Sequence, residues 1–168
     1  EDLKRGDFTI NAMAYNDAVG LVDVFGGRQD LQNKIVRCVG NPQERFTEDA
    51  LRILRAVRFS AQLGFSIEEK TKEAAKILAP TLKNISAERI QTELLKLLVS
   101  KNPHYLKTAW EMGITKIVLP EFDAMMETDK GEKTLKAFAH TNADKVERLA
   151  VLFANMEKTP EKSRDLAK

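Results

Sequence analysis

The stretch EDALRILRAVR, residues 48–58, decides how the rest of this sequence is interpreted. Apolar side chains recur every three or four residues through it and just beyond it, at Ala50, Leu54, Val57 and Ala61. At about 100° per residue, these side chains fall within about 60° of one another on a helix. Gly64 follows them and is a typical helix end. We therefore predict one long helix over residues 43–63 with its apolar stripe in a core.

The opposite side of this predicted helix is charged. Asp49, Arg52 and Arg55 project away from the apolar stripe, and Arg58 lies at its border. Asp49 and Arg52 also form an i,i+3 pair of opposite charge, which would fix both side chains. Such a ridge is typical of a solvated face on which each ion pair contributes under about 1 kcal/mol. It can also offer an acceptor and several donors to a nucleobase edge and to phosphates. The spacing alone leaves both interpretations open.

The fold class expected from the whole chain is mostly α. Further helices are predicted over residues 67–78, 87–99, 103–112, 120–127, 133–140 and 144–155. Before residue 42, glycine-rich turns separate short apolar runs, and residues 21–25 and 35–39 are strand candidates. Two or three strands are marginal alone, so we expect a small β-hairpin or sheet remnant of a larger sheet outside this sequence.

Composition excludes several classes of protein. The 168 residues carry a net charge of +2, with 31% charged and 43% hydrophobic residues, which is ordinary globular usage. No apolar run approaches the roughly 18 residues of a membrane span, and no signal peptide is visible. Cys38 is the only cysteine, so no disulfide forms within the chain. The sequence opens at Glu1 within a motif, and we interpret it as a piece of a longer cytoplasmic protein.

Four segments resemble, in order, motifs of the class II tRNA nucleotidyltransferases, a family that includes the CCA-adding enzymes. DLKRGDFTINAMA (residues 2–14) resembles the Arg-Arg-Asp-x-Thr motif, and LVDVFGG (21–27) with Asp30, Leu31 and Arg37 resembles the third motif. EDALR (48–52), continued by Arg55, Arg58 and Phe59, resembles the Glu-Asp-x-x-Arg motif. ISAER (85–89), with Glu93 and Lys96, is similar to the helix that follows. Residues 101–168 match only in being helical.

The resemblance implies a template-free polymerase that adds C, C and A to tRNA 3′ ends from CTP and ATP. It implies that Asp49 and Arg52 read the Watson–Crick edge of the incoming base and that Arg55 and Arg58 belong to the same nucleotide site. The chemistry fits, because Asp accepts from the exocyclic amino group of cytosine and adenine while Arg donates to ring acceptors. Uracil and guanine present the reverse pattern on that edge and would be rejected.

The sequence departs from the family pattern near its start. The expected double arginine is Arg5-Gly6, which leaves Arg5 as a secondary candidate for nucleotide binding. Asp7 is a second such candidate, although we expect it mainly to order the local turn. The family's Gly-rich loop and Asp-x-Asp pair, which hold Mg²⁺ ions, do not occur in this sequence. We therefore assign no catalytic residue and no metal ligand here, and we expect this piece to be inactive by itself.

The resemblance also predicts three parts: the end of a nucleotidyltransferase head (1–41), a helical neck that recognises the nucleotide (42–100) and a helical body (101–168). The body could include a degenerate HD-type segment, but His140 has no later His-Asp pair, so we expect no metal there. Two alternatives stay open. One is a bacterial poly(A) polymerase of the same superfamily, and the other is a non-catalytic helical module that binds RNA phosphates through the arginine ridge.

Overall fold

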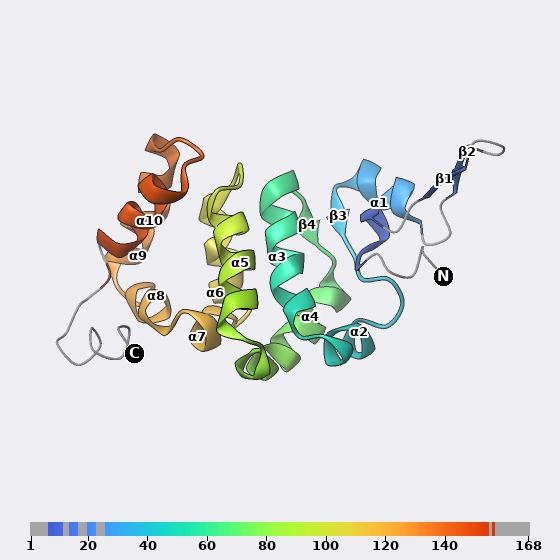
Figure 1. Ribbon diagram of the computed structural model, residues 1–168, viewed down its shortest axis with the longest axis horizontal. Coiled ribbons are helices and arrows are strands. Elements are labelled where there is room, and N and C mark those ends of the chain that lie inside the picture. The colour runs from blue at the N-terminus through green and yellow to red at the C-terminus, as the bar shows by residue number, and fades with distance from the viewer. Residues whose placement is uncertain (1–6, 12–13, 17–19, 23–25, 155, 157–168) are drawn as a thin grey trace.

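The computed structural model of the chain describes residues 7–11, 14–16, 20–22, 26–154 and 156, with only the backbone of the two strands at 14–16 and 20–22. The helices stand in an elongated row, with the N-terminal pieces at one end and the last helices at the other (Figure 1). The α-helices are α1 (Gly27–Asn33), α2 (Pro42–Glu48), α3 (Leu51–Leu63), α4 (Glu69–Leu78), α5 (Ala87–Leu98), α6 (Leu106–Glu111), α7 (Thr115–Val118), α8 (Pro120–Met125), α9 (Asp129–Ala137) and α10 (Lys145–Ala154). The expectation of a mostly α fold is confirmed.

Short 3₁₀ turns and strands connect these helices. The 3₁₀ turns are η2 (Thr9–Asn11), η3 (Ala79–Asn84), η4 (Pro103–Tyr105) and η5 (Phe138–His140). Strands β1 (Ala14–Asn16) and β2 (Gly20–Val22) form an antiparallel pair, so the candidate strand over 21–25 begins earlier and pairs with residues 14–16, not with the second candidate over 35–39. Strand β3 (Ile35–Val36) instead pairs in parallel with β4 (Ser66–Ile67), and Phe8 forms an isolated bridge with Cys38. The β3–β4 pairing joins the segment before α2 to the segment that follows α3. The Phe8–Cys38 bridge joins the N-terminal residues to the same segment before α2.

The predicted single helix over residues 43–63 is wrong in one respect, because it is two helices with a break at Asp49. The backbone of Asp49 is extended, with φ −154° and ψ 104°. Its Oδ1 accepts a hydrogen bond of 3.2 Å from the backbone N–H of Leu51. Aspartate competes well for such free N–H groups at a helix start, so it favours a cap here over a helix interior.

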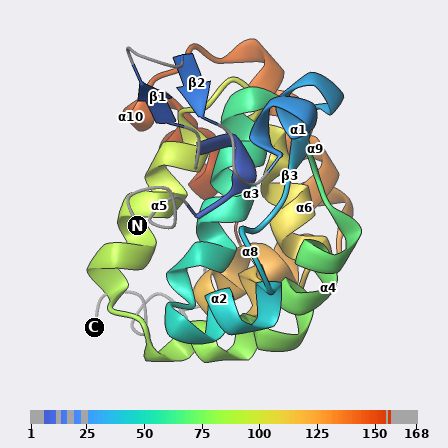
Figure 2. The ribbon, with the colours of Figure 1, turned by 90° about the vertical axis from the view of Figure 1, so that its right-hand side faces the viewer.

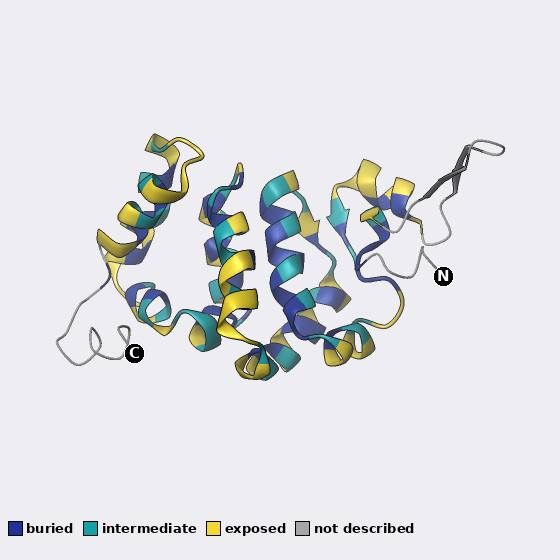
Figure 3. Ribbon diagram, viewed as in Figure 1, coloured by how far each residue is buried: buried dark blue, intermediate teal, exposed yellow. Residues whose placement is uncertain are grey.

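Helix α3 lies at the centre of the core. It packs between α5 on one side and the short strands β3 and β4 on the other (Figure 2). The predicted stripe is buried, at Ala50, Leu54, Val57 and Ala61, but so are Ile53, Ala56, Arg58 and Ser60. Figure 3 shows that α3 is buried along most of its length, whereas α5 keeps one exposed face. Only a narrow line of α3 side chains, which includes Arg52 and Arg55, is partly open to solvent.

The other predicted helices are present with shifted ends. Ser86 caps α5 by accepting a hydrogen bond from the N–H of Arg89, and Asn41 caps α2 in the same way from Glu44. The Glu68 carboxylate caps α4 by accepting hydrogen bonds from the N–H groups of Lys70 and Thr71. Within the described residues, no helix is both long and apolar enough to span a membrane.

Candidate functional site

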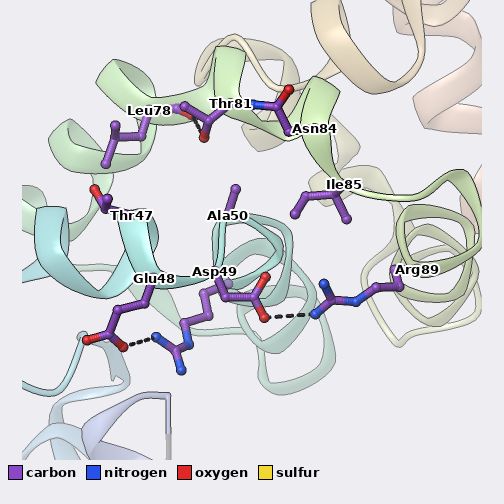
Figure 4. A pocket seen from close by; sticks show the side chains of 10 residues that line it. Thr47, Glu48, Asp49, Ala50, Leu78, Thr81, Asn84, Ile85 and Arg89 are labelled. Carbon is purple, nitrogen blue, oxygen red and sulfur yellow. Dashed lines mark hydrogen bonds and ion pairs between the residues drawn. The ribbon is translucent and has the colours of Figure 1, made fainter.

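A cleft of about 650 Å³ opens where the break between α2 and α3 faces the start of α5. It brings together polar side chains from α2, α3, η3 and α5 (Figure 4). The residues that line it are Thr47, Glu48, Asp49, Ala50, Arg52, Leu78, Thr81, Asn84, Ile85 and Arg89. Asp49 and Arg52, the predicted base-reading pair, therefore both line this cleft.

Asp49 is held in this cleft by Arg89. The Nη2 of Arg89 donates a hydrogen bond of 2.8 Å to Oδ2 of Asp49 (Figure 4). Partial burial by itself would raise the pKa of Asp49. Hydrogen bonds from Arg89 and from the Leu51 N–H, together with the charges of Arg89 and Arg52, outweigh that effect and hold the pKa below its ordinary value. Asp49 is therefore an ionised acceptor at neutral pH.

Arg52 is held by other partners than the expected one. Its Nη1 lies 2.6 Å from Oε2 of Glu48 and donates a 2.9 Å hydrogen bond to the carbonyl of Arg45. Its Nε lies 3.4 Å from Oδ1 of Asp7. The predicted i,i+3 pairing of Asp49 with Arg52 is replaced by these contacts, because the extended backbone at Asp49 takes it off the helix. Arg52 also lowers the pKa of Glu48 through their hydrogen bond.

Asp7 has a larger part in the site than the sequence suggests. Its carboxylate is 7% exposed and contacts both Arg52 and Arg55, the latter through an ion pair to Nε. Its backbone carbonyl also accepts a 3.2 Å hydrogen bond from the N–H of Val39. A residue in the N-terminal motif thus aligns two arginines of α3. The signal in the sequence is that Asp7 is the Asp of the segment that resembles the Arg-Arg-Asp-x-Thr motif, while Arg5 of the same segment lies outside the described residues.

Arg58 is not at the border of an exposed ridge, as predicted, but inside the core. It is 8% exposed, and its Nε lies 2.6 Å from Oε1 of Glu93 on α5, which is 4% exposed. Its guanidinium also lies 4.3 Å from the centre of the Phe59 ring. The helical wheel misplaces Arg58 because α5 packs on the side of α3 that the wheel treats as open.

The arrangement offers a carboxylate acceptor and a guanidinium donor at one rim, each fixed by a second residue. Arg89 fixes the acceptor, while Glu48 and Asp7 fix the donor. Such groups can pair with a planar ligand edge that presents both a donor and an acceptor. Arg89 was noted in the sequence only as part of a motif, since its contact with Asp49 joins residues 40 positions apart.

Comparisons with known proteins identify relatives of this chain. A family model described as the poly(A) polymerase head domain matches residues 1–37, and one described as a probable RNA- and SrmB-binding site of polymerase A matches residues 64–126. The CCA-adding enzyme of Ligilactobacillus salivarius (strain UCC118) is 54% identical over 103 residues, which are 61% of this chain and 26% of that enzyme. The chain belongs to the CCA-adding enzyme and poly(A) polymerase family.

Solved structures extend the family resemblance to nearly the whole chain. The Bacillus stearothermophilus CCA-adding enzyme in complex with CTP matches with a TM-score of 0.72 and 26% identity, over 96% of this chain and 56% of that one. The Thermotoga maritima CCA-adding enzyme complexed with tRNA matches with a TM-score of 0.68 and 31% identity, over 90% and 40% respectively. The chain spans about a quarter of the length of the curated relatives in this family that it matches.

Proposed function

We propose that this chain is the nucleotide- and tRNA-binding part of a CCA-adding tRNA nucleotidyltransferase, which adds C, C and A to tRNA 3′ ends from CTP and ATP. The observation that carries the proposal is the placement of Asp49 and Arg52 at the rim of one cleft. The similarity to enzymes named for CCA addition, one of them in complex with CTP and another with tRNA, supports the same conclusion.

In this proposal the ionised Asp49 accepts a hydrogen bond from the exocyclic amino group of cytosine or adenine, and Arg52 donates to the neighbouring ring acceptor. Asp49 reaches the base once its contact with Arg89 is shared or released. Arg55, which is partly exposed one turn along α3, contacts the ribose or the phosphates, with Asp7 as its anchor. Arg58 belongs to the same site as a support that fixes α3 against α5. Arg5 is a further candidate cation near the phosphates.

The catalytic metal ions are assigned to another part of the protein. In the described ranges between residues 7 and 156, no group of three or more His, Cys, Asp or Glu side chains is placed to hold a metal ion. We propose binding roles only for this chain, with Mg²⁺ acting in the intact enzyme on carboxylates outside this sequence. On this view residues 1–41 end the head, 42–100 form the neck and 101–168 form the body of a cytoplasmic enzyme.

The test is the base preference of the full-length enzyme. For Asp49→Ala and Arg52→Ala, we expect the ratio of kcat/KM for CTP and ATP over UTP and GTP to fall by about 10- to 100-fold, since each loses a hydrogen bond to the base edge. Asp129→Ala, which removes an exposed carboxylate on α9, is the matched control. An unaltered preference in both site variants would exclude the base-reading role.

A poly(A) polymerase is the second candidate, because both matching family models carry that description. The two activities differ in their product on a tRNA that lacks its CCA end. Addition of three nucleotides ending in A supports the CCA-adding enzyme, and a long A tail supports the polymerase. If the site variants leave base preference unchanged while RNA still binds, the chain is the helical RNA-binding module considered above.

A further inference from the structure

A second cleft, of about 550 Å³, lies in the C-terminal half, between the segment that follows α5, the end of α9 and the first turns of α10. Its lining is strongly basic. The cationic or titratable side chains around it are Lys101, His104, Lys107, Lys136 and Arg148. Glu132 is the single carboxylate among its lining residues. It thus differs from the cleft at Asp49, where acids and arginines alternate.

Arg148 is the residue that makes this cleft more than a group of surface lysines. It is only 5% exposed, although it carries a full positive charge. Its Nη1 donates to the carbonyls of Leu98 and Ser100, and its Nε donates a 3.2 Å hydrogen bond to Oγ1 of Thr141. Among the described residues, no carboxylate lies within ion-pair distance of it, and its Nη2 has no hydrogen-bond partner.

The contacts of Arg148 compensate its charge only in part. The Leu98 and Ser100 carbonyls lie at the C-terminal end of α5, where a helix dipole contributes about half of one negative charge. Burial lowers the pKa of the Arg148 guanidinium, which is the expected effect of an incompletely paired cation. A buried charge without a partner is costly, so a site of this kind is stabilised when an anion binds.

The neighbouring lysines add to the positive field. Lys101 and Lys107 are exposed, and no carboxylate of the described residues lies within 4.0 Å of either ammonium group. Lys136 reaches Glu132 only at 3.8 Å, on the exposed face of α9. Clustered cations around a guanidinium fork are well suited to phosphate oxygens, which accept several charge-assisted hydrogen bonds at once. They offer no acceptor pattern with which to read a base.

The position of the cleft relative to Asp49 favours a phosphate within a long RNA. Helix α5 begins beside Asp49, through Arg89, and ends at the carbonyls that Arg148 binds. Figure 1 shows α5 running at roughly right angles to the long axis of the molecule. At about 1.5 Å per residue, the separation along α5 is roughly 15–20 Å. A ligand that contacts both clefts must therefore be much longer than one nucleotide.

We propose that the Arg148 cleft binds a backbone phosphate of the RNA whose 3′ end lies at the Asp49 cleft. The inference rests on the proposed function, because it takes the partner to be RNA. Arg148 and the surrounding lysines then favour an RNA that is long enough to reach both clefts, and they do not affect the choice of nucleotide. The cleft is a phosphate-binding site distinct from the nucleotide site.

The experiment measures the dissociation constant of the full-length protein for tRNA lacking CCA, by fluorescence anisotropy, from 50 to 200 mM KCl. For Lys101→Ala/Lys107→Ala, we expect weaker binding at low salt and a log–log salt slope that is smaller by about 1 to 2, as each lysine near a phosphate contributes about 1. The control, Lys116→Ala/Lys133→Ala, removes two exposed lysines that do not line the cleft, and its slope should not change. Equal slopes for the two double variants would overturn the proposal.

Two further variants test the sign of the charge effect on tRNA binding. A further readout tests whether the bound phosphate belongs to RNA or to a nucleoside triphosphate. Glu132→Gln removes the single lining carboxylate and should strengthen tRNA binding about two- to three-fold at low salt, which loss of folding cannot mimic. Arg148→Met should weaken it, with the unfolding midpoint measured alongside. If the lysine double variant instead raises KM for CTP and leaves the tRNA salt slope unchanged, the cleft holds the triphosphate and the proposal is wrong. Base preference stays the separate measure of the Asp49 site, so either proposal can fail alone.

Discussion

Arg89 donates a 2.8 Å hydrogen bond from its Nη2 to Oδ2 of Asp49, and this contact joins the start of α5 to the start of α3. It has two effects on the proposed nucleotide site. It keeps the Asp49 carboxylate ionised, and it fixes the direction in which that carboxylate points, while Arg52 is held separately by Glu48 and Asp7. Acceptor and donor are therefore positioned by independent partners, and each can be altered without the other.

The role of Arg89 as a positioning residue predicts a change in the titration of Asp49. In Arg89→Ala we expect the pKa of Asp49 to rise, because burial is then opposed by fewer favourable contacts. The stability linked to its lowered pKa is present above the ordinary pKa and is lost as pH falls through the folded value, so that loss should move to higher pH. Carboxyl carbon NMR shifts measured from pH 2 to 6 report this directly.

Arg89→Lys is the matched control for this prediction, since it keeps the charge and loses the planar fork. It should shift the titration of Asp49 less than Arg89→Ala does. If both variants titrate as the unaltered protein does, Arg89 does not control the ionisation of Asp49.

The buried pair of Arg58 and Glu93 predicts a large and non-additive effect on stability. Their contact is 2.6 Å long, and both residues are more than nine-tenths buried. Removing one partner leaves the other charge uncompensated in the core, so Glu93→Gln or Arg58→Met should each lower the free energy of unfolding by about 3–5 kcal/mol. Urea denaturation of each single variant measures this effect.

The double variant Arg58→Met/Glu93→Gln completes the cycle. It should cost less than the sum of the single variants, because no unpaired charge is left behind. The exposed pair of Asp129 and Lys133 is the comparison, with an expected effect under about 1 kcal/mol. Additive single effects at Arg58 and Glu93 would contradict a coupled buried pair.

Cys38 predicts slow thiol chemistry in the folded protein. Burial raises the pKa of its thiol from an ordinary value of about 9 to about 12. At pH 8 the thiolate fraction is then about a thousand-fold smaller than in the unfolded chain. Because the thiolate is the reactive form, alkylation by iodoacetamide should be slower by a similar factor. The stability linked to this shift is complete below pH 9 and is lost as pH rises towards 12. Mass spectrometry of timed samples, with and without urea, measures both rates.

Much of the fold follows from single segments of the sequence. The apolar stripe of α3 is a local pattern, and its side chains are buried as the sequence predicts. The break at Asp49 was visible in principle, because a short acid before an apolar run favours a helix start. The prediction of one helix instead follows the apolar period from Ala50 to Ala61 and extends that helix back to residue 43 without a break.

The parts of the site that sequence reasoning missed are all long-range. Asp7 contacts arginines more than 40 positions away, and Arg89 contacts Asp49 across 40 positions. A helical wheel describes one helix and its own two faces, so it cannot show that α5 covers the side of α3 where Arg58 lies. Residue types at the site were therefore predictable, whereas their partners were not.

The parallel pairing of β3 with β4 has a consequence for how the protein could be divided. Val36, from the segment assigned to the head, is fully buried and registers with Ile67 beyond α3, and the N–H of Glu68 donates to the carbonyl of Val36. A recombinant neck limited to residues 42–100 would lack this strand and would expose Ile67 and the adjoining side of α3. A truncation that keeps this pairing must start no later than Lys34, whose carbonyl accepts a hydrogen bond from the N–H of Ser66.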